Sequence, residues 1–478
     1  MALGIAGMQA EAPPSAQPAV LGLTPADVQD VAEALDVYCA QFAPLFRRSE
    51  QRQWARKYLE GQLLDLERKS IEPMALALAG GNVQAMQQFI SAGGWDDEAV
   101  LSTHQRLVAD TLGDATTGVL ILDGCDFPKQ GAESVGVARQ WCGALGKVAN
   151  CQAGVLAAYA GAAGYTLVDR RLYLPQAWFD AAHAGRRQAC GVPPETPFRT
   201  KPELAWEMLC AARERGNLSF RYVTMDEGFG RNTTLLDRVS GAGLSYLAEV
   251  PHDTEVGQER PVPPPKHLIP GVRLIDPPPM PERVDRVARR LPPAAWRQET
   301  IKQGSKGPIQ VQVACLRVVA RRDDRPGPEV WLLVRRGLQP DAELKTYLCN
   351  APTDTPRRTL IWLLGMRWPI ELAIRECKDA LGMDHYEVRG WRGWHHHLTM
   401  TLLAHHFLVW QRIQLGGKIT RLDPAPGALP AHRHPAPASL RRGDRPGPPA
   451  LPAGTQLCGC PGPPSRYQPP ASPRPVTT

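Results

Sequence analysis

The sequence predicts an α/β fold in which a mixed sheet is flanked by helices. Between residues 119 and 250, short apolar runs bounded by turn residues alternate with helical stretches. Helical periodicity dominates before this region and again after residue 346, and two further β-type runs lie between. At 478 residues and 43% hydrophobic content, the chain can bury a large core and form more than one domain.

The N-terminal quarter is expected to be helical. Residues 1–24 are rich in Ala and Pro and are expected to be disordered. Residues 25–115 repeat apolar side chains at helical spacing, among them Leu35 and Phe42, and are expected to form a helical domain, which its basic segment makes a candidate DNA-binding domain. Its basic segment, residues 47–70, could lie on DNA or form the solvated face of a small helical bundle.

Residues 116–250 are expected to form the first part of an α/β core. The predicted strands are "GVLIL", "CQAGVLAAYA", "YTLVDRRLYLP", "FRYVTMD" and "LSYLAEVP", and "KPELAWEMLCAARERG" is a predicted helix. The stretch "AGYTLVDRRLYLP" alternates polar and apolar residues, which predicts an antiparallel hairpin with one exposed side.

The rest of the chain divides into three parts. Residues 251–345 start Pro-rich and continue into "GPIQVQVACLRVVARR" and "PEVWLLVRR", so a β-rich insertion is expected there. Residues 346–420 contain the long helical region "TPRRTLIWLLGMRWPIELAIRECKDALG" and are expected to complete the core. Residues 421–478 form a tail rich in Pro and Arg, which is expected to be disordered.

Charge and composition exclude several classes of protein. The net charge of +7 arises after residue 410, where nine Lys or Arg face two Asp, so it is weak support for a nucleic-acid partner. No apolar run is long enough for a membrane span, and no basic region precedes the first apolar residues. The eleven cysteines mostly lack paired spacing, which favours reduced thiols. A cytoplasmic protein is expected.

Two apolar strands each end in an aspartate. Asp123 follows "VLIL" and Asp226 follows "FRYVTM", and both precede turn residues. A carboxylate held by rigid backbone at a strand end suits a hard cation, although a lone Asp there is also a common turn residue. Glu371, Arg375 and Lys378 share one face of a predicted helix. In one interpretation, the three side chains form a row of ion pairs on the protein surface. In the other, Glu371 is a metal ligand and the two cations beside it bind a polyanion.

Four blocks in this order resemble the DDE transposases of bacterial insertion sequences, whose RNase H-like core contains a large β-rich insertion. The resemblance covers roughly residues 30 to 418. The blocks are "LDGCDFPKQGAESVGVARQWCGALGKVANCQAGV", "VTMDEGFGRNTTLL", "YLCNAP" and "RWPIELAIRECKDALGMDHYEVRGWRGWHHHLTMTLLAHHFL".

The resemblance implies that Asp123, Asp226 and Glu371 are the catalytic acids and bind two Mg²⁺ or Mn²⁺ ions. The family's helix signature of Tyr, Arg, Glu and Lys has Leu364 at its Tyr position, and Cys125 replaces a common Thr. Residues expected to contact DNA phosphates are Arg367, Lys378, Arg139, Lys129 and Lys147.

The implied function is that of an insertion-sequence transposase in the bacterial nucleoid. It would bind terminal inverted repeats, cleave double-stranded DNA at the element ends and join the 3′-hydroxyls to target DNA, as a homodimer on the DNA. Two alternatives remain open. One is an inactive or degraded copy that acts only as a DNA-binding protein, and the other is an RNase H-like nuclease that does not join ends.

The run "GWRGWHHHLTMTLLAHHFL" contains five histidines that could suggest a metal site. The spacing of its Leu and Met residues favours a packed helix instead. Trp391 and Trp394 in this run either stack on DNA bases or belong to the core.

Overall fold

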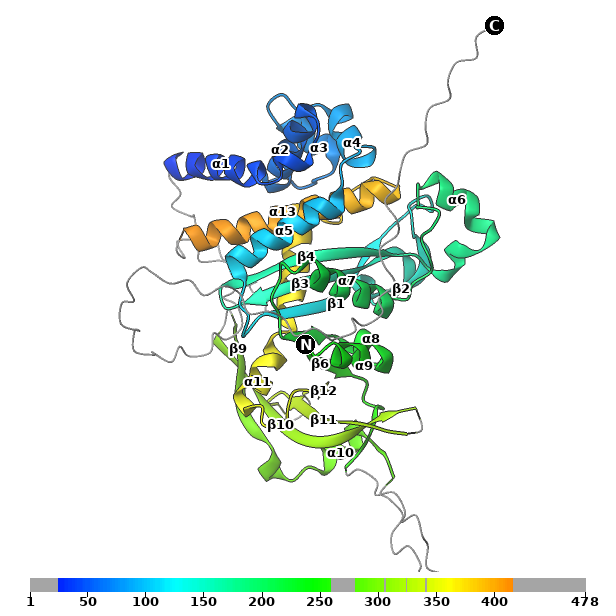
Figure 1. Ribbon diagram of the computed structural model, residues 1–478, viewed down its shortest axis with the longest axis vertical. Helices are drawn as coiled ribbons and strands as arrows, with labels where there is room; N and C mark the ends of the chain where they lie inside the picture. Colours follow the sequence, from blue (N-terminus) through cyan, green and yellow to red (C-terminus); the bar gives the residue numbers. More distant parts are fainter. Residues whose placement is uncertain (1–24, 259–279, 305–306, 324, 340–341, 416–478) are drawn as a thin grey trace, which may run out of the picture.

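The computed structural model places helices on both sides of one large mixed sheet (Figure 1), which confirms the predicted fold class. The expectations for residues 1–24, for the tail from residue 421 and for most of the Pro-rich start of the insertion lie outside the described residues. The structure describes residues 25–258, 280–304, 307–323, 325–339 and 342–415.

Within the described residues, the sheet has twelve strands. Most strands follow the order β2-β3-β1-β5-β6-β12-β11-β10-β7-β8, while β4 pairs with β3 and β9 with β10. The pairs β1–β5 and β5–β6 are parallel and the others are antiparallel. The strands are β1 (Val119–Pro128), β2 (Ala138–Cys142), β3 (Lys147–Gly161), β4 (Gly164–Tyr173), β5 (Tyr222–Met225), β6 (Ser245–Val250), β7 (Glu255–Gly257), β8 (Glu282–Arg283), β9 (Arg297–Gly304), β10 (Gly307–Arg322), β11 (Arg325–Arg336) and β12 (Leu344–Cys349).

The long helical region predicted near residues 355–382 forms two helices, α11 and α12. Pro369 causes the break, because its ring would clash with the carbonyl of Gly365 four residues earlier, which is where α11 ends. The α-helices are α1 (Pro25–Ala40), α2 (Ser49–Leu63), α3 (Ile71–Ala77), α4 (Val83–Ser91), α5 (Asp97–Leu112), α6 (Ala184–Ala189), α7 (Lys201–Arg215), α8 (Glu227–Gly230), α9 (Thr233–Gly241), α10 (Val284–Arg290), α11 (Arg357–Gly365), α12 (Trp368–Leu381) and α13 (Trp391–Gln414).

Strand β1 is buried on both faces. Val119 and Ile121 pack into a core that includes residues of α12 and α13, while Leu120 and Leu122 pack into a second core that includes residues of α7 and α9. All four side chains are fully buried. Because successive side chains of a strand point to opposite faces, an uninterrupted apolar run requires helices on both sides of the sheet.

The β3–β4 hairpin is antiparallel, as predicted, but its expected exposed side is covered. Thr166, Asp169 and Arg170 of β4 are fully buried. Helices α5 and α13 lie across this strand and contact it (Figure 1). The alternation therefore does not mark a solvated face, because helices distant in the sequence supply the polar partners that these side chains need.

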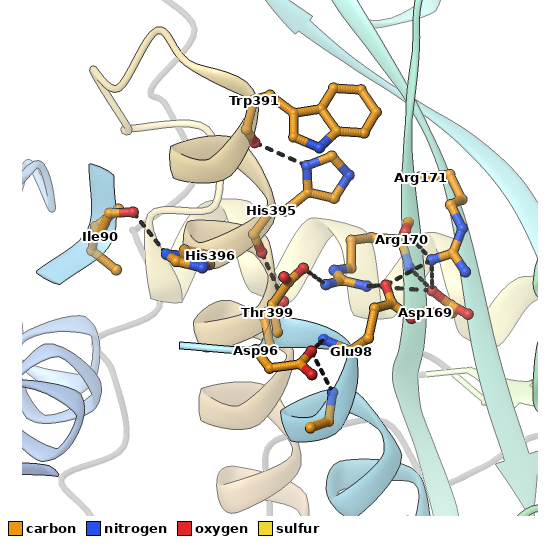
Figure 2. Close-up of polar contacts among 12 residues, drawn as sticks. Ile90, Asp96, Glu98, Asp169, Arg170, Arg171, Trp391, His395, His396 and Thr399 are labelled. Atoms are coloured by element: carbon orange, nitrogen blue, oxygen red, sulfur yellow. Dashed lines mark hydrogen bonds and ion pairs between the residues drawn. The ribbon is translucent and has the colours of Figure 1, made fainter. Parts of the chain in front are cut away.

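Ion pairs join β4 to the N-terminal helices (Figure 2). The Arg170 guanidinium pairs with Asp97 and with Glu98 (3.0 Å), both in the first turn of α5, and Arg171 pairs with Asp169 at 2.7 Å. Although burial opposes ionisation of Glu98, the surrounding arginines hold the pKa of its carboxyl well below the usual range. The first turn of α5 is thus fixed to the sheet by ion pairs with a buried arginine.

The histidine-rich run forms α13, and its packing confirms the expected core helix. The ring of His396 stacks on Trp95 with centroids 3.6 Å apart, and its Nδ1 lies 2.9 Å from the Ile90 carbonyl (Figure 2). Trp394 is fully buried, so it belongs to the core and does not stack on DNA bases. No helix in the described part of the chain is both long and apolar enough to cross a membrane.

Candidate active site

Asp123 and Asp226 are neighbours where β5 ends beside β1. Asp226 follows the last residue of β5, whereas Asp123 lies inside β1, so the prediction that this strand ends at Asp123 is wrong: pairing with β3 continues the strand to Pro128. Leu122 of β1 pairs with Met225 of β5, and the two aspartates are the next residues of their chains. The Asp123 Oδ1 accepts a hydrogen bond from the Gly124 N–H (2.7 Å). Asp226 caps the short helix α8. The register of the strands therefore brings together two carboxylates that lie about a hundred residues apart in the sequence.

The two aspartates share a poorly solvated environment. Burial and the carboxylates of Asp226 and Glu371 raise the pKa of Asp123 well above its usual range. Burial also raises the pKa of Asp226. Acids that are this close and this poorly hydrated repel one another when ionised, so a cation bound among them would stabilise the charged form.

Glu371 reaches this region from the first turn of α12. The Thr224 hydroxyl of β5 donates a hydrogen bond to the Met366 carbonyl (3.3 Å), which ties the strand to the residues just before the helix. The Glu371 side chain is 34% exposed and pairs with Arg367, whose Nη1 lies 2.5 Å from Oε1. The third predicted acid therefore lies within electrostatic reach of Asp123 but has a cationic partner of its own.

A fourth carboxylate, that of Glu249 on β6, lies next to Asp226 of the neighbouring chain segment. It was not predicted. Ala248 of β6 pairs with Met225 of β5, so Glu249 lies beside Asp226. Its carboxylate pairs with Lys345 Nζ (2.8 Å) and with Arg367 Nε (3.3 Å), and the residue is 8% exposed. The available signal was a single Glu inside the apolar strand "LSYLAEVP". Charged residues are rarely buried without a partner, so this Glu could have been suspected.

The ligand chemistry at this end of the sheet fits a hard divalent cation. Asp123, Asp226 and Glu371 offer only carboxylate oxygens, the donors that Mg²⁺ and Mn²⁺ prefer. No three His, Cys, Asp or Glu side chains among the described residues are already spaced as ligands of one ion. Glu371 is paired with Arg367, so its carboxylate would have to exchange the guanidinium for a metal ion.

The cations predicted to contact DNA lie in different surroundings. Arg367 lies among the carboxylates, and Lys378 Nζ donates a hydrogen bond to a backbone carbonyl of β1 (3.0 Å). Arg139 and Lys147 are exposed on β2 and at the start of β3. Lys129 packs inward, with Nζ 3.6 Å from the centroid of an aromatic ring. Arg139 and Lys147 thus face solvent, while Lys129 does not.

The two departures from the family pattern are both buried. Cys125 is 3% exposed, and burial raises the pKa of its thiol to about 12, which makes it unreactive. Leu364 packs in the core near the end of α11. An apolar side chain therefore fills the position at which the resembling family has a Tyr.

Comparisons with known proteins find two matches to parts of the chain. A protein-family model described as "DDE superfamily endonuclease" matches residues 41–308, more than half of the chain and a range that contains Asp123 and Asp226. A curated relative from Microchaete diplosiphon, described as "Probable transposase for insertion sequence element IS701", is 27% identical over 224 residues. This match covers 45% of the chain and 53% of the relative, so it spans about half the length of that protein.

Proposed function

The chain belongs to the DDE superfamily endonucleases, and on this premise we propose that it is the transposase of an insertion sequence. It binds the terminal inverted repeats of its element, cleaves the DNA at the element ends and joins the freed 3′-hydroxyls to target DNA. The observation that carries the proposal is the position of Asp123 and Asp226 on adjacent parallel strands, with Glu371 in electrostatic reach.

In this proposal, Asp123, Asp226 and Glu371 hold two divalent cations, Mg²⁺ or Mn²⁺. Such a pair of ions activates the attacking oxygen and stabilises the leaving oxygen of a phosphodiester. The two aspartates are fixed by strand backbone, and Asp226 is fixed further by the Phe229 N–H (3.2 Å). Glu371 is the adjustable member, because it lies on a helix and must leave Arg367 to act as a ligand.

Arg367 then becomes available to the DNA. Its Nε side remains paired with Glu249, so the guanidinium stays beside the acids when Glu371 turns away. A phosphate oxygen is a strong acceptor for the vacated N–H groups. Lys378, Arg139 and Lys147 are further candidates for phosphate contacts, which position the duplex without reading its sequence.

The proposed partners are double-stranded element ends and target DNA. Joining both ends of one element requires that they be held together, so we propose a homodimer assembled on the DNA. The N-terminal helices, residues 25–115, are the proposed DNA-binding domain, attached to the core through the Arg170 ion pairs.

The metal assignment is tested with Asp226→Asn. Asparagine is as good a helix cap as aspartate, so the hydrogen bond to Phe229 and the fold are retained while the charge is lost. With Mg²⁺ or Mn²⁺, the wild-type protein should cut labelled duplexes that carry an element end. The variant should lose more than about 100-fold in rate, beyond the loss typical of groups that only support a ligand.

The matched control is Asp237→Asn, which removes an aspartate charge in the same way at an exposed position of α9, outside the carboxylate cluster and the proposed DNA-binding domain. It should cut like the wild type. Cleavage by Asp226→Asn at the wild-type rate would rule out the assigned mechanism. Pre-cut ends with free 3′-hydroxyls then test joining. Hydrolysis without joining would indicate a nuclease, and DNA binding without cleavage in either metal would indicate a DNA-binding protein.

A further inference from the structure

The hairpin of β2 and β3 exposes an apolar surface. Trp141, Leu145 and Val148 are 63%, 47% and 50% exposed, within one stretch of eight residues. Single exposed apolar residues are normal on a protein surface, but adjacent ones mark sites of interaction. None of the proposed metal ligands lies in this hairpin, so its apolar tip has no role in the site described above.

The register of the hairpin places the apolar side chains next to a cation. Trp141 pairs with Val148, and Arg139 pairs with Asn150. Because side chains alternate along a strand and paired residues share a face, these four lie on one face of the hairpin. Cys142, on the opposite face, is fully buried. The outer face thus carries the Trp141 indole beside the Val148 side chain, with the Arg139 guanidinium two residues along the same strand as Trp141.

The charge of the hairpin indicates the chemistry of its partner. Residues 134–151 contain two cations, Arg139 and Lys147, and no Asp or Glu. Both cations are exposed. A partner that offers negative charge beside flat apolar surfaces fits this face, and DNA offers both in its phosphates and its bases.

The tip of the hairpin is anchored beside the carboxylate cluster. The Gly143 N–H donates a hydrogen bond to Asp126 Oδ2 (2.6 Å), and the Asp126 carbonyl accepts one from Lys378 Nζ (3.0 Å). Asp126 lies on β1, three residues after Asp123, a separation of about 10 Å along a strand. DNA bound at the acids would therefore pass close to this tip.

We propose that the outer face of the β2–β3 hairpin binds DNA next to the phosphodiester that is cleaved. Arg139 on this face contacts a phosphate, and Trp141 stacks on a base that has left the duplex stack. Lys147 pairs with Cys142 and so lies off this face, but it is exposed at the edge of the hairpin and contacts a neighbouring phosphate. The inference rests on the proposed function, because it takes the substrate to be DNA. An inserted aromatic side chain opens a base step, which would expose the backbone to the nearby acids.

The test uses Trp141→Ala in the full-length chain and an element-end duplex with 2-aminopurine beside the cleavage position. Binding is measured by fluorescence anisotropy in metal-free buffer, so that the result does not depend on cleavage. The affinity should fall about 5- to 150-fold, the effect of removing one stacking side chain. The rise in 2-aminopurine fluorescence, which reports unstacking, should disappear. Trp141→Phe keeps a ring and should keep most of both signals.

Leu338→Ala is the control, because Leu338 is 49% exposed in the β-rich insertion, outside the proposed DNA-binding domain, and its truncation should change neither signal. Wild-type affinity and an unchanged 2-aminopurine signal in Trp141→Ala would overturn the proposal. A change of oligomeric state in sedimentation, without a change in DNA affinity, would also overturn it and make the face a protein interface. If the wild type failed to cleave, the transposase proposal would be wrong. The proposal for the hairpin would still be tested, since DNA binding is measured in metal-free buffer and does not depend on cleavage.

Discussion

Arg367 forms an ion pair with Glu371 in which Nη1 lies 2.5 Å from Oε1. The other side of the same guanidinium faces Glu249, with Nε 3.3 Å from Oε2. One cation thus lies between a predicted metal ligand and a buried carboxylate that the sequence did not reveal. Metal binding and the position of this guanidinium are therefore coupled, and several predictions depend on that coupling.

Replacing Glu249 with Gln should slow DNA cleavage by about 10- to 100-fold, the usual cost of losing a group that orients a functional side chain. The reason is that Arg367 would lose its charged anchor and be held only by Glu371. DNA affinity in metal-free buffer should change little. The control, Glu299→Gln, removes the carboxylate partner of Arg357 (2.9 Å) in the insertion and should leave the rate unchanged. Equal losses in both variants would contradict a positioning role.

Removing the guanidinium with Arg367→Ala should strengthen Mn²⁺ binding in the absence of DNA, although cleavage is lost. Glu371 would be free to act as a ligand, and a positive charge that competes with the ion would be gone. A unit charge at ion-pair distance is worth at least about 1 kcal/mol, so the dissociation constant should fall about 5-fold or more. Isothermal titration calorimetry measures this change, with Arg357→Ala as the unaffected comparison. Weaker Mn²⁺ binding would refute the competition.

The buried histidines should make the fold sensitive to mild acid. Burial lowers the pKa of four of them from the ordinary 6.5 to about 4, so between these values the unfolded chain binds protons that the folded chain does not. Stability should therefore fall as the pH drops from 6.5 to 4, with up to about 3 kcal/mol from each group. The four residues are His104, His395, His396 and His397.

Urea unfolding at a series of pH values measures this slope. His396→Gln removes one of the four groups and should flatten the dependence, whatever its effect on stability at pH 7.5. If the free energy of unfolding of the wild type were constant from pH 6.5 to 4.5, the histidines would not be held neutral by burial.

Arg170→Met should destabilise the protein by about 1 to 3 kcal/mol, because it removes a fully buried guanidinium that pairs with Asp97, Glu98 and the buried Asp169. The guanidinium is fully buried and pairs with Asp97 and Glu98 of α5. The matched control is Arg56→Met, since Arg56 also pairs with two acids but is partly exposed. Its loss should cost less than about 1 kcal/mol. Comparable destabilisation of both variants in urea unfolding would show that burial of the Arg170 pairs is unimportant.

Local patterns predicted most of the strands and the positions of the three acids, while contacts between distant segments were not readable. Asp123 and Asp226 follow short apolar runs that lie in β1 and β5, and such continuous runs predict strands buried on both faces, although β1 continues beyond Asp123 to Pro128. Glu249 escaped notice because nothing in its own strand shows that Arg367, more than a hundred residues later, would pair with it.

Three further predictions were wrong or missing, for different reasons. The polar residues of β4 suggested solvent, yet their partners come from α5, some seventy residues earlier in the chain. Strand β2 is only five residues long and lacked a recognisable run, so the hairpin that carries Trp141 was not predicted. The break before α12 was readable from Pro369, which the long apolar periodicity around it concealed.

Because the strands of the insertion continue the central sheet, the motion of the insertion relative to the core is restricted. Strand β12 pairs with β11 of the insertion on one side and with β6 on the other, where Tyr347 lies opposite Glu249. No flexible joint separates the two parts along this path, since any swing would break main-chain hydrogen bonds. The insertion is therefore expected to move together with the core. A displacement of β11 would also displace β12 and, through it, β6, the strand that carries Glu249.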